Sequence, residues 1–240
     1  MTEGADRDGN GGGTVDSDPS EPQVGTDEAG KGPVLGPMVA AAIRARPDAI
    51  PDGVDDSKRL SEAKRESIAA ALREGEDVEI GVAVVPTDRI DDSGTDMNSL
   101  TVAAHAEAIG AVATERDRVV ADAGDVDAAR FARRVGDGVS ERIGVSADIH
   151  AEHGADATYP LVAAASIIAK VERDARVDAL NDDYPDHGPV GSGYPSDPVT
   201  RDFLRRYVGD TGELPDCARA SWATADDVRA AAEQSSLSEF

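Results

Sequence analysis

The amino-acid sequence predicts an α/β core followed by a helical C-terminal appendage. Strand patterns come first along the chain, helical patterns dominate later, and no segment repeats. Val78, Ile80, Val82 and Val84 alternate with other residues, which is the two-residue period of a half-buried strand. The segment at 160–180 begins apolar on almost every side, which is typical of a buried helix.

The other elements are predicted from local signals. A Gly/Pro-rich turn precedes the apolar stretch at 34–46, which we expect to be a strand. A helix is expected from Ser61, a capping residue, to Glu74, just before Gly75. Pro160 suits the first turn of the buried helix. Further strands are expected at 119–122 and 146–152, further helices at 98–114, 127–135 and 199–208, and a loop at 188–198.

The net charge of −24, from 24 basic and 48 acidic residues, is the most unusual feature of the composition. Alone it argues against a nucleic-acid partner, because cations make the phosphate contacts. However, the chain has only four lysines and 3% aromatic residues and is rich in alanine and acids, which is typical of halophilic proteins. The Debye length falls to ~3 Å in 1 M salt, so charge repulsion is largely screened there. Nucleic acid therefore stays among the expected partners.

The chain is expected to act inside the cell. Cys217 is the only cysteine, which excludes a disulfide framework within one chain and suits a reducing cytosol. No apolar run approaches the ~18–20 residues that span a membrane. The acidic, glycine-rich start does not resemble a signal peptide. We therefore expect a cytoplasmic monomer without membrane contact, in which residues 1–21 form a disordered acidic extension.

Four acidic residues fall where strands end or helices begin. Asp27 and Glu28 close the first strand, Asp122 ends the strand at 119–122, and Asp156 precedes the buried helix. Strand ends and an adjoining helix start can meet at one sheet edge, and carboxylates crowded there need cations. Hard divalent ions such as Mg²⁺ prefer these oxygen ligands. Two such ions ~3.5–4 Å apart stabilise in-line phosphoryl displacement.

Other interpretations of these acids stay open. With 48 acidic residues in the chain, Asp122 or Asp156 taken alone would be a solvated surface residue. Asp27 and Glu28 are neighbours on a strand, so their side chains point to opposite faces. Both can serve one site only if the chain bends at Glu28 or if Glu28 contributes its backbone carbonyl.

Five motifs, in order, resemble type 2 ribonuclease H (ribonuclease HII). The first is D-E-A-G-K-G-P, and the last, G-S-G-Y-P-S-D-P, resembles the archaeal branch in particular. A lone D-E-x-G would be weak evidence, whereas five ordered motifs across about 23–228 are strong evidence. The motifs lie at 27–33, 56–60, 122–126, 165–174 and 191–198.

The resemblance implies a ribonuclease H-like mixed β-sheet flanked by helices, in a catalytic domain at 22–195, with a helical segment at 196–240. It implies an endonuclease that hydrolyses the RNA strand of RNA/DNA hybrids and nicks DNA 5′ of embedded ribonucleotides, leaving a 5′-phosphate and a 3′-hydroxyl. In that family four carboxylates hold two divalent cations, Mg²⁺ or Mn²⁺. Asp27 would bridge the ions, Asp156 would hold the water-activating ion, and Glu28 and Asp122 would hold the ion at the leaving oxygen.

The resemblance also implies residues that bind the substrate. The turn Gly30-Lys31-Gly32 would present backbone groups to the ribose 2′-hydroxyl, which agrees with the close approach that glycines permit. Tyr194 would stack on the sugar of the next nucleotide. Without the resemblance, a tyrosine in a Pro/Gly-rich loop would be interpreted as a packing residue.

The resemblance also gives a role to two further lysines, and the sequence departs from the family pattern at two positions. Lys58 and Lys170 would lie near phosphates. Lys31 stands where arginine is more usual, which keeps the charge but loses the bidentate fork. Gly154 stands where the family usually has a lysine, just before Asp156. We interpret Asp174 as structural, paired with the preceding arginine.

The last seven residues resemble a clamp-binding peptide, in which Gln234, Leu237 and Phe240 would make the contacts. The alternative is a frayed polar tail. Two other interpretations of the whole chain stay open. One is a non-catalytic acidic module that binds divalent cations or a clamp, and the other is a related nuclease such as type 1 ribonuclease H. Outside the motifs, His105 is interpreted as packed or solvent-facing and Trp222 as a core anchor for the tail.

Overall fold

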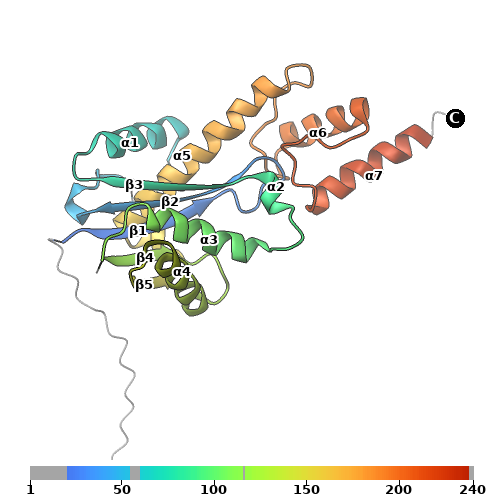
Figure 1. Ribbon diagram of the computed structural model, residues 1–240. Helices are drawn as coiled ribbons and strands as arrows, with labels where there is room; N and C mark the ends of the chain where they lie inside the picture. The colour runs from blue at the N-terminus through green and yellow to red at the C-terminus, as the bar shows by residue number, and fades with distance from the viewer. Residues whose placement is uncertain (1–20, 55–59, 116, 238–240) are drawn as a thin grey trace, which may run out of the picture.

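The computed structural model describes residues 21–54, 60–115 and 117–237 (Figure 1). Three of the predictions therefore lie outside the described residues: the extension at 1–20, Lys58 with most of its motif, and Phe240. Side chains in the last helix are described through Gln234.

A five-stranded mixed sheet in the order β3-β2-β1-β4-β5 forms the centre of the protein (Figure 1). β1 (Gln23–Ala29) lies in the middle, antiparallel to β2 (Met38–Ala45) and parallel to β4 (Arg118–Asp122). β3 (Glu79–Val85) pairs antiparallel with β2, and β5 (Asp148–Glu152) pairs parallel with β4. The mixed sheet expected from the resemblance is confirmed.

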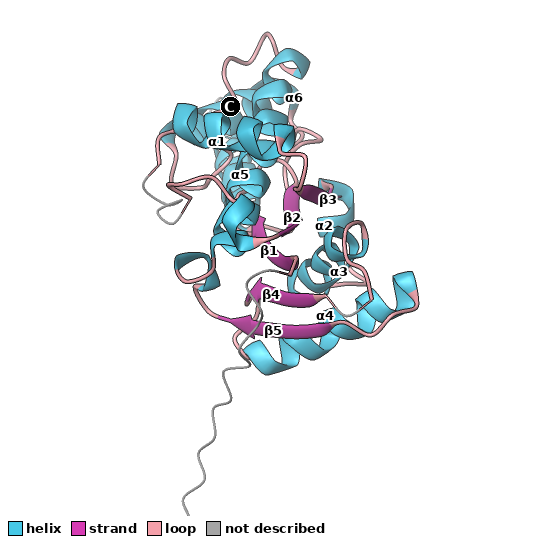
Figure 2. Cartoon of the chain, turned by 90° about the vertical axis from the view of Figure 1, so that its left-hand side faces the viewer, coloured by secondary structure: helices cyan, strands magenta, loops and turns pink. Residues whose placement is uncertain are grey.

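Helices cover both faces of this sheet (Figure 2). α1 (Glu62–Glu74) and α5 (Pro160–Asp183) pack on one face, and α3 (Met97–Gly110) and α4 (Ala128–Ile143) pack on the other. Alternate side chains of β2 enter the two cores, so this strand is buried on both faces. Burial on both faces explains why β2 is apolar throughout instead of alternating with polar residues.

A third core joins the C-terminal appendage to the sheet domain. It contains apolar side chains of α6 (Pro198–Thr211) and Val228 of α7 (Ala223–Leu237). Val34 and Leu35, from the segment between β1 and β2, complete it. Leu35 also forms an isolated bridge with Ala218. The appendage is therefore packed against the turn that follows β1. Short helices complete the chain: α2 (Thr87–Ile90), η1 (Pro47–Ala49) and η2 (Ala155–Ala157). None of the helices in the described ranges is long and apolar enough to cross a membrane.

Two predicted bounds were wrong, each for a physical reason. The strand expected at 34–46 begins only at Met38, because residues 34–36 bond to the loop at Gly193 and to the C-terminal segment instead of to a sheet neighbour. The helix expected at 127–135 continues to Ile143 and ends at Gly144, whose φ of 71° is left-handed. The expected helical C-terminal segment contains α7, which packs on α6.

The start of α5 lies directly over β1. A Cβ at Gly25 would come 2.3 Å from the carbonyl carbon of Leu161 and 2.4 Å from the nitrogen of Val162. Only glycine allows this approach. The contact brings the buried helix to the strand that carries Asp27.

Candidate active site

Asp27 lies near the end of the central strand, facing α5. Its side chain is 6% exposed, and one oxygen accepts the N–H of Glu28 at 2.7 Å. The Ser166 hydroxyl of α5 also bonds to it. Burial first, and then the charges of Glu28 and Asp122, raises the pKa of Asp27 well above its ordinary value. The site therefore holds a carboxylate whose negative charge is poorly compensated by the protein.

Glu28 faces the opposite side of the sheet and bonds to α3. Its Oε2 lies 2.9 Å from Nε2 of His105, whose Nδ1 lies 3.0 Å from the Thr26 hydroxyl. Burial alone would raise the pKa of Glu28, but the hydrogen bond and charge of His105, with the Lys31 ammonium, lower it. His105 is fully buried, so it is a packed histidine that also orients Glu28. The sequence interpretation missed this second role, which the helical position alone could not reveal.

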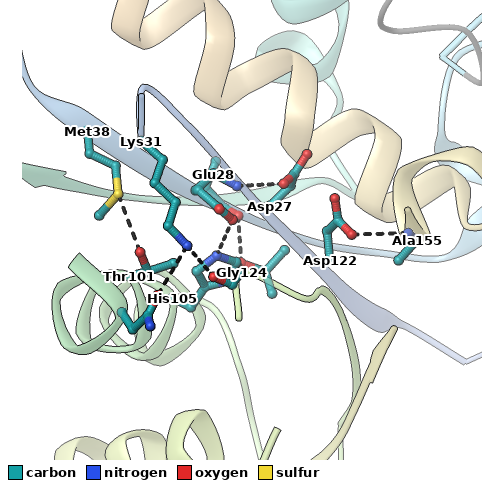
Figure 3. Close-up of polar contacts among 12 residues, drawn as sticks. Asp27, Glu28, Lys31, Met38, Thr101, His105, Asp122, Gly124 and Ala155 are labelled. Atoms are coloured by element: carbon teal, nitrogen blue, oxygen red, sulfur yellow. Dashed lines mark hydrogen bonds and ion pairs between the residues drawn. The ribbon is translucent and has the colours of Figure 1, made fainter. Parts of the chain in front are cut away.

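β1 does not bend at Glu28. Its pairing with β2 continues through Ala29, and the first left-handed residue is Gly30, with φ of 88°. The alternation of strand side chains therefore holds, and Asp27 and Glu28 reach the end of the sheet from its two faces (Figure 3).

Asp122 lies beside Asp27 on the neighbouring parallel strand. Thr26 pairs with Ala121, so the two acids occupy the next position on each strand. One oxygen of Asp122 accepts the N–H of Gly154 at 2.7 Å and that of Ala155 at 3.2 Å. Asp156 is the following residue of η2 and is 5% exposed. Asp122 thus ties the segment that carries Asp156 to the end of the sheet.

The donor set fits a divalent metal, although the acids do not form a closed ligand cluster. Within residues 21–54, 60–115 and 117–237, no three acidic, histidine or cysteine side chains are already arranged to hold an ion. Asp27, Glu28 and Asp122 nevertheless gather at one end of the sheet, and their mutual repulsion acts on a buried carboxylate (Figure 3). A cation would relieve this repulsion, and carboxylate oxygens are the ligands that hard divalent ions prefer.

Two of the predicted lysines lie beside these acids. Lys31 turns back from its loop and donates to the carbonyl of Gly124, with Asn98 at 3.5 Å (Figure 3). Lys170 donates to the Ser166 hydroxyl at 2.6 Å, and Ser166 in turn bonds to Asp27. Lys170 is therefore linked to Asp27 through Ser166, and the charge of Lys31 acts on Glu28. Ser166 is a connecting residue that the sequence interpretation did not single out.

The loop that carries Tyr194 lies against the turn after β1. The carbonyl of Gly193 accepts the N–H of Val34 at 2.8 Å. Tyr194 is 40% exposed, and its ring stacks on Arg173, whose guanidinium carbon is 5.0 Å from the ring centre. An exposed aromatic ring on a buried cationic support is suited to stacking on a ligand.

The interpretation of Asp174 agrees with the structure. Its carboxylate binds Arg173 at 3.1 Å and lies 3.6 Å from Arg65. It holds arginines and does not join the other acids. Gln234, by contrast, is exposed near the end of α7, which projects away from the sheet (Figure 1).

Comparison with known proteins decides the family. The model of the family described as Ribonuclease HII matches residues 24–225. A ribonuclease HII of Halobacterium salinarum is 56% identical over 218 residues, which cover 91% of this chain and 99% of that protein. The chain belongs to the ribonuclease HII family. It is accordingly a metal-dependent endonuclease with ribonuclease H activity on RNA/DNA hybrids.

Solved structures agree with this ribonuclease HII assignment. The ribonuclease H2 of Pyrococcus horikoshii has a TM-score of 0.76 and 34% identity, covering 89% of this chain and 99% of that one. A ribonuclease HII from Archaeoglobus fulgidus, solved in complex with PCNA, has a TM-score of 0.72 and 37% identity. The similarity to that protein covers 86% of this chain and 96% of the other. The family resemblance seen in the motifs is therefore confirmed, and the non-catalytic alternative is not favoured.

Proposed function

We propose that this ribonuclease HII, which acts on RNA/DNA hybrids by hydrolysing their RNA strand, also nicks DNA on the 5′ side of embedded ribonucleotides. The products would be a 5′-phosphate and a 3′-hydroxyl. Two divalent ions, Mg²⁺ or Mn²⁺, would be held by Asp27, Glu28, Asp122 and Asp156. The observation that carries this proposal is the crowding of a buried Asp27 with Glu28 and Asp122 at the end of the central strand.

The chain's own groups would prepare the reaction. When bound, the metal ions would supply an activated water and stabilise the departing oxygen. Ser166 and His105 orient Asp27 and Glu28, so the carboxylates are held before substrate arrives. Lys170 and Lys31 would place positive charge near the phosphates.

The surroundings of the acids provide means to recognise ribose. The Gly30-Lys31-Gly32 turn would present backbone groups to the 2′-hydroxyl, and Tyr194 would stack on the adjoining sugar. Gly30 has φ of 88°, and a Cβ there would lie 2.7 Å from the carbonyl oxygen of Pro37. Gly32 is exposed with no atom within 4 Å of its Cβ position, which leaves room for a nucleotide beside it.

The proposal is tested with a DNA duplex that contains one ribonucleotide, in molar KCl because the chain is so acidic. We expect a single nick 5′ of the ribonucleotide with Mg²⁺ or Mn²⁺, and none in EDTA or on an all-DNA duplex. Asp156→Asn should abolish nicking while circular dichroism shows an unchanged fold. A mutant that nicks as fast as the parent would contradict the role of Asp156, and a parent without metal-dependent nicking would overturn the proposed function.

We also infer that the C-terminal residues Gln234, Leu237 and Phe240 bind a sliding clamp. The Archaeoglobus relative was solved in complex with PCNA, and Gln234 is exposed near the end of a projecting helix (Figure 1). A clamp contact would place the enzyme at sites of replication and repair in the cytoplasm.

The clamp proposal predicts that a chain ending at residue 233 binds a PCNA-type clamp at least about tenfold more weakly. Binding would be measured by calorimetry, with Ser235→Ala as a matched control in the tail. Nicking without clamp should not change. Equal clamp affinity in the shortened chain would show that the contact lies elsewhere.

A further inference from the structure

The turn that would read the ribose is held by a segment almost two hundred residues away. The N–H of Gly36 donates to the carbonyl of Cys217, and the N–H of Arg219 donates to the carbonyl of Val34, each at 2.8 Å. The 217–222 segment is itself fixed by Asp91, which accepts the N–H of Ala220 at 2.7 Å. The turn therefore rests on an anchored support.

The side chain of Arg219 makes the main contacts in this support. It is fully buried and donates to the carbonyl oxygens of Gly30 at 2.6 Å, Lys31 at 3.1 Å and Gly36 at 3.0 Å. The indole N–H of Trp222 donates to the carbonyl of Gly32 at 3.3 Å. The Trp222 ring also lies 4.9 Å from the Arg219 guanidinium. These two side chains thus bind three successive carbonyls of the turn.

Binding the carbonyls also fixes the amides. In a trans peptide the C=O and the next N–H point in opposite directions, and no cis bond occurs among the described residues. Because Arg219 binds the carbonyls of residues 30 and 31, the N–H groups of Lys31 and Gly32 must point away from the buried support. Those are the backbone donors that the turn can offer to a sugar.

A second buried arginine lies under the ring of Tyr194. Arg173 is 3% exposed, donates to the carbonyl of Ser192 at 2.6 Å and lies under the Tyr194 ring. Burial first, and then the nearby charge of Arg173, lowers the pKa of Arg219 to about 10. Both buried arginines donate to backbone carbonyls, Arg219 in the turn and Arg173 at Ser192.

We propose that Arg219 is a positioning residue for ribose recognition. With Trp222 it orients the peptides of the 30–32 turn toward the 2′-hydroxyl. The inference rests on the proposed function, because it assigns a cause to the selectivity of that same site.

The test compares binding of a DNA duplex holding one ribonucleotide with binding of the same all-DNA duplex. Fluorescence anisotropy is measured in molar KCl with Mg²⁺, and every variant also carries Asp27→Asn so that the strand stays intact. We expect Arg219→Lys, which loses the planar fork, to reduce the preference for the ribonucleotide about tenfold. Trp222→Phe, which loses one hydrogen bond, should reduce it about threefold.

The matched control is Arg44→Lys. Arg44 lies on β2 beside Val24, at the end of β1 far from the turn, and binds Asp117 at 2.8 Å. Its replacement should change stability but not the preference for the ribonucleotide. If Arg219→Lys does not fold, Trp222→Phe carries the test, because Trp222 is only half-buried. If the folded variants keep the parent's preference for the ribonucleotide-containing duplex, the role of Arg219 is overturned. The proposed function still stands in that case, provided that the protein with Asp27 intact cuts this duplex. A parent that neither cuts nor prefers the ribonucleotide would overturn both.

Discussion

Replacing Asp27 by asparagine is expected to reduce strand cleavage at least about 10³-fold and, in EDTA, to make the protein more stable. The loss follows because Asp27 is the acid that would touch both ions, and each tenfold corresponds to about 1.4 kcal/mol of activation free energy. The gain follows because Asp27 is 6% exposed and is repelled by Glu28 and Asp122. Removing that buried charge should raise the free energy of unfolding by about 1–2 kcal/mol.

The two effects are measured separately, as nicking rate with Mg²⁺ and as thermal midpoint in EDTA. Asp202→Asn is the matched control, because the Asp202 side chain is 64% exposed and pairs with Arg205 on α6. It should alter neither quantity appreciably. A lower midpoint for Asp27→Asn in EDTA would mean that the carboxylate is compensated in a way that its contacts do not reveal.

Gly25→Ala is expected to destabilise the fold by about 3 kcal/mol. The added methyl would lie 2.3–2.4 Å from backbone atoms of Leu161 and Val162, which no change of side-chain rotamer can relieve. The start of α5 must therefore move away from β1. Since Ser166 and Lys170 lie on the same helix, cleavage should fall as well, even in the fraction that remains folded.

Urea unfolding in molar KCl measures this effect, and Gly209→Ala provides its control. Gly209 lies on the exposed side of α6, with no atom within 4 Å of its Cβ position. Alanine there should stabilise the helix by about 0.5–1 kcal/mol. Equal stability of Gly25→Ala and the parent would show that α5 can shift without cost.

The elements with strong local signals were predicted well from the sequence. Ser61 does cap α1, accepting the N–H of Lys64, and Pro160 does open α5. The four acids were predicted as candidate ligands because strand ends and helix starts are visible in the apolar pattern. The position of Asp27 beside Asp122 follows from the parallel pairing of β1 with β4. The apolar pattern alone does not specify this pairing.

Contacts between distant segments were the part that the sequence could not predict. His105 falls on a helix whose apolar residues give no sign that its ring meets Glu28. The bonds from Arg219 to the turn depend on how the C-terminal segment folds back onto the sheet domain, which no local pattern in the sequence indicates. Side-chain roles of this kind depend on tertiary packing, which has no local period.

The large sequence separation between the turn and Arg219 matters while the chain is being synthesised. Gly30 and Arg219, which bond to each other, are 189 positions apart. A ribosome therefore releases the central strand and its acids long before the arginine that steadies the neighbouring turn. Such distant pairings form slowly, and domains complete themselves only when their last segment emerges. We expect an unfinished chain to remain unable to distinguish ribose from deoxyribose until Arg219 has been synthesised and has bonded to the turn.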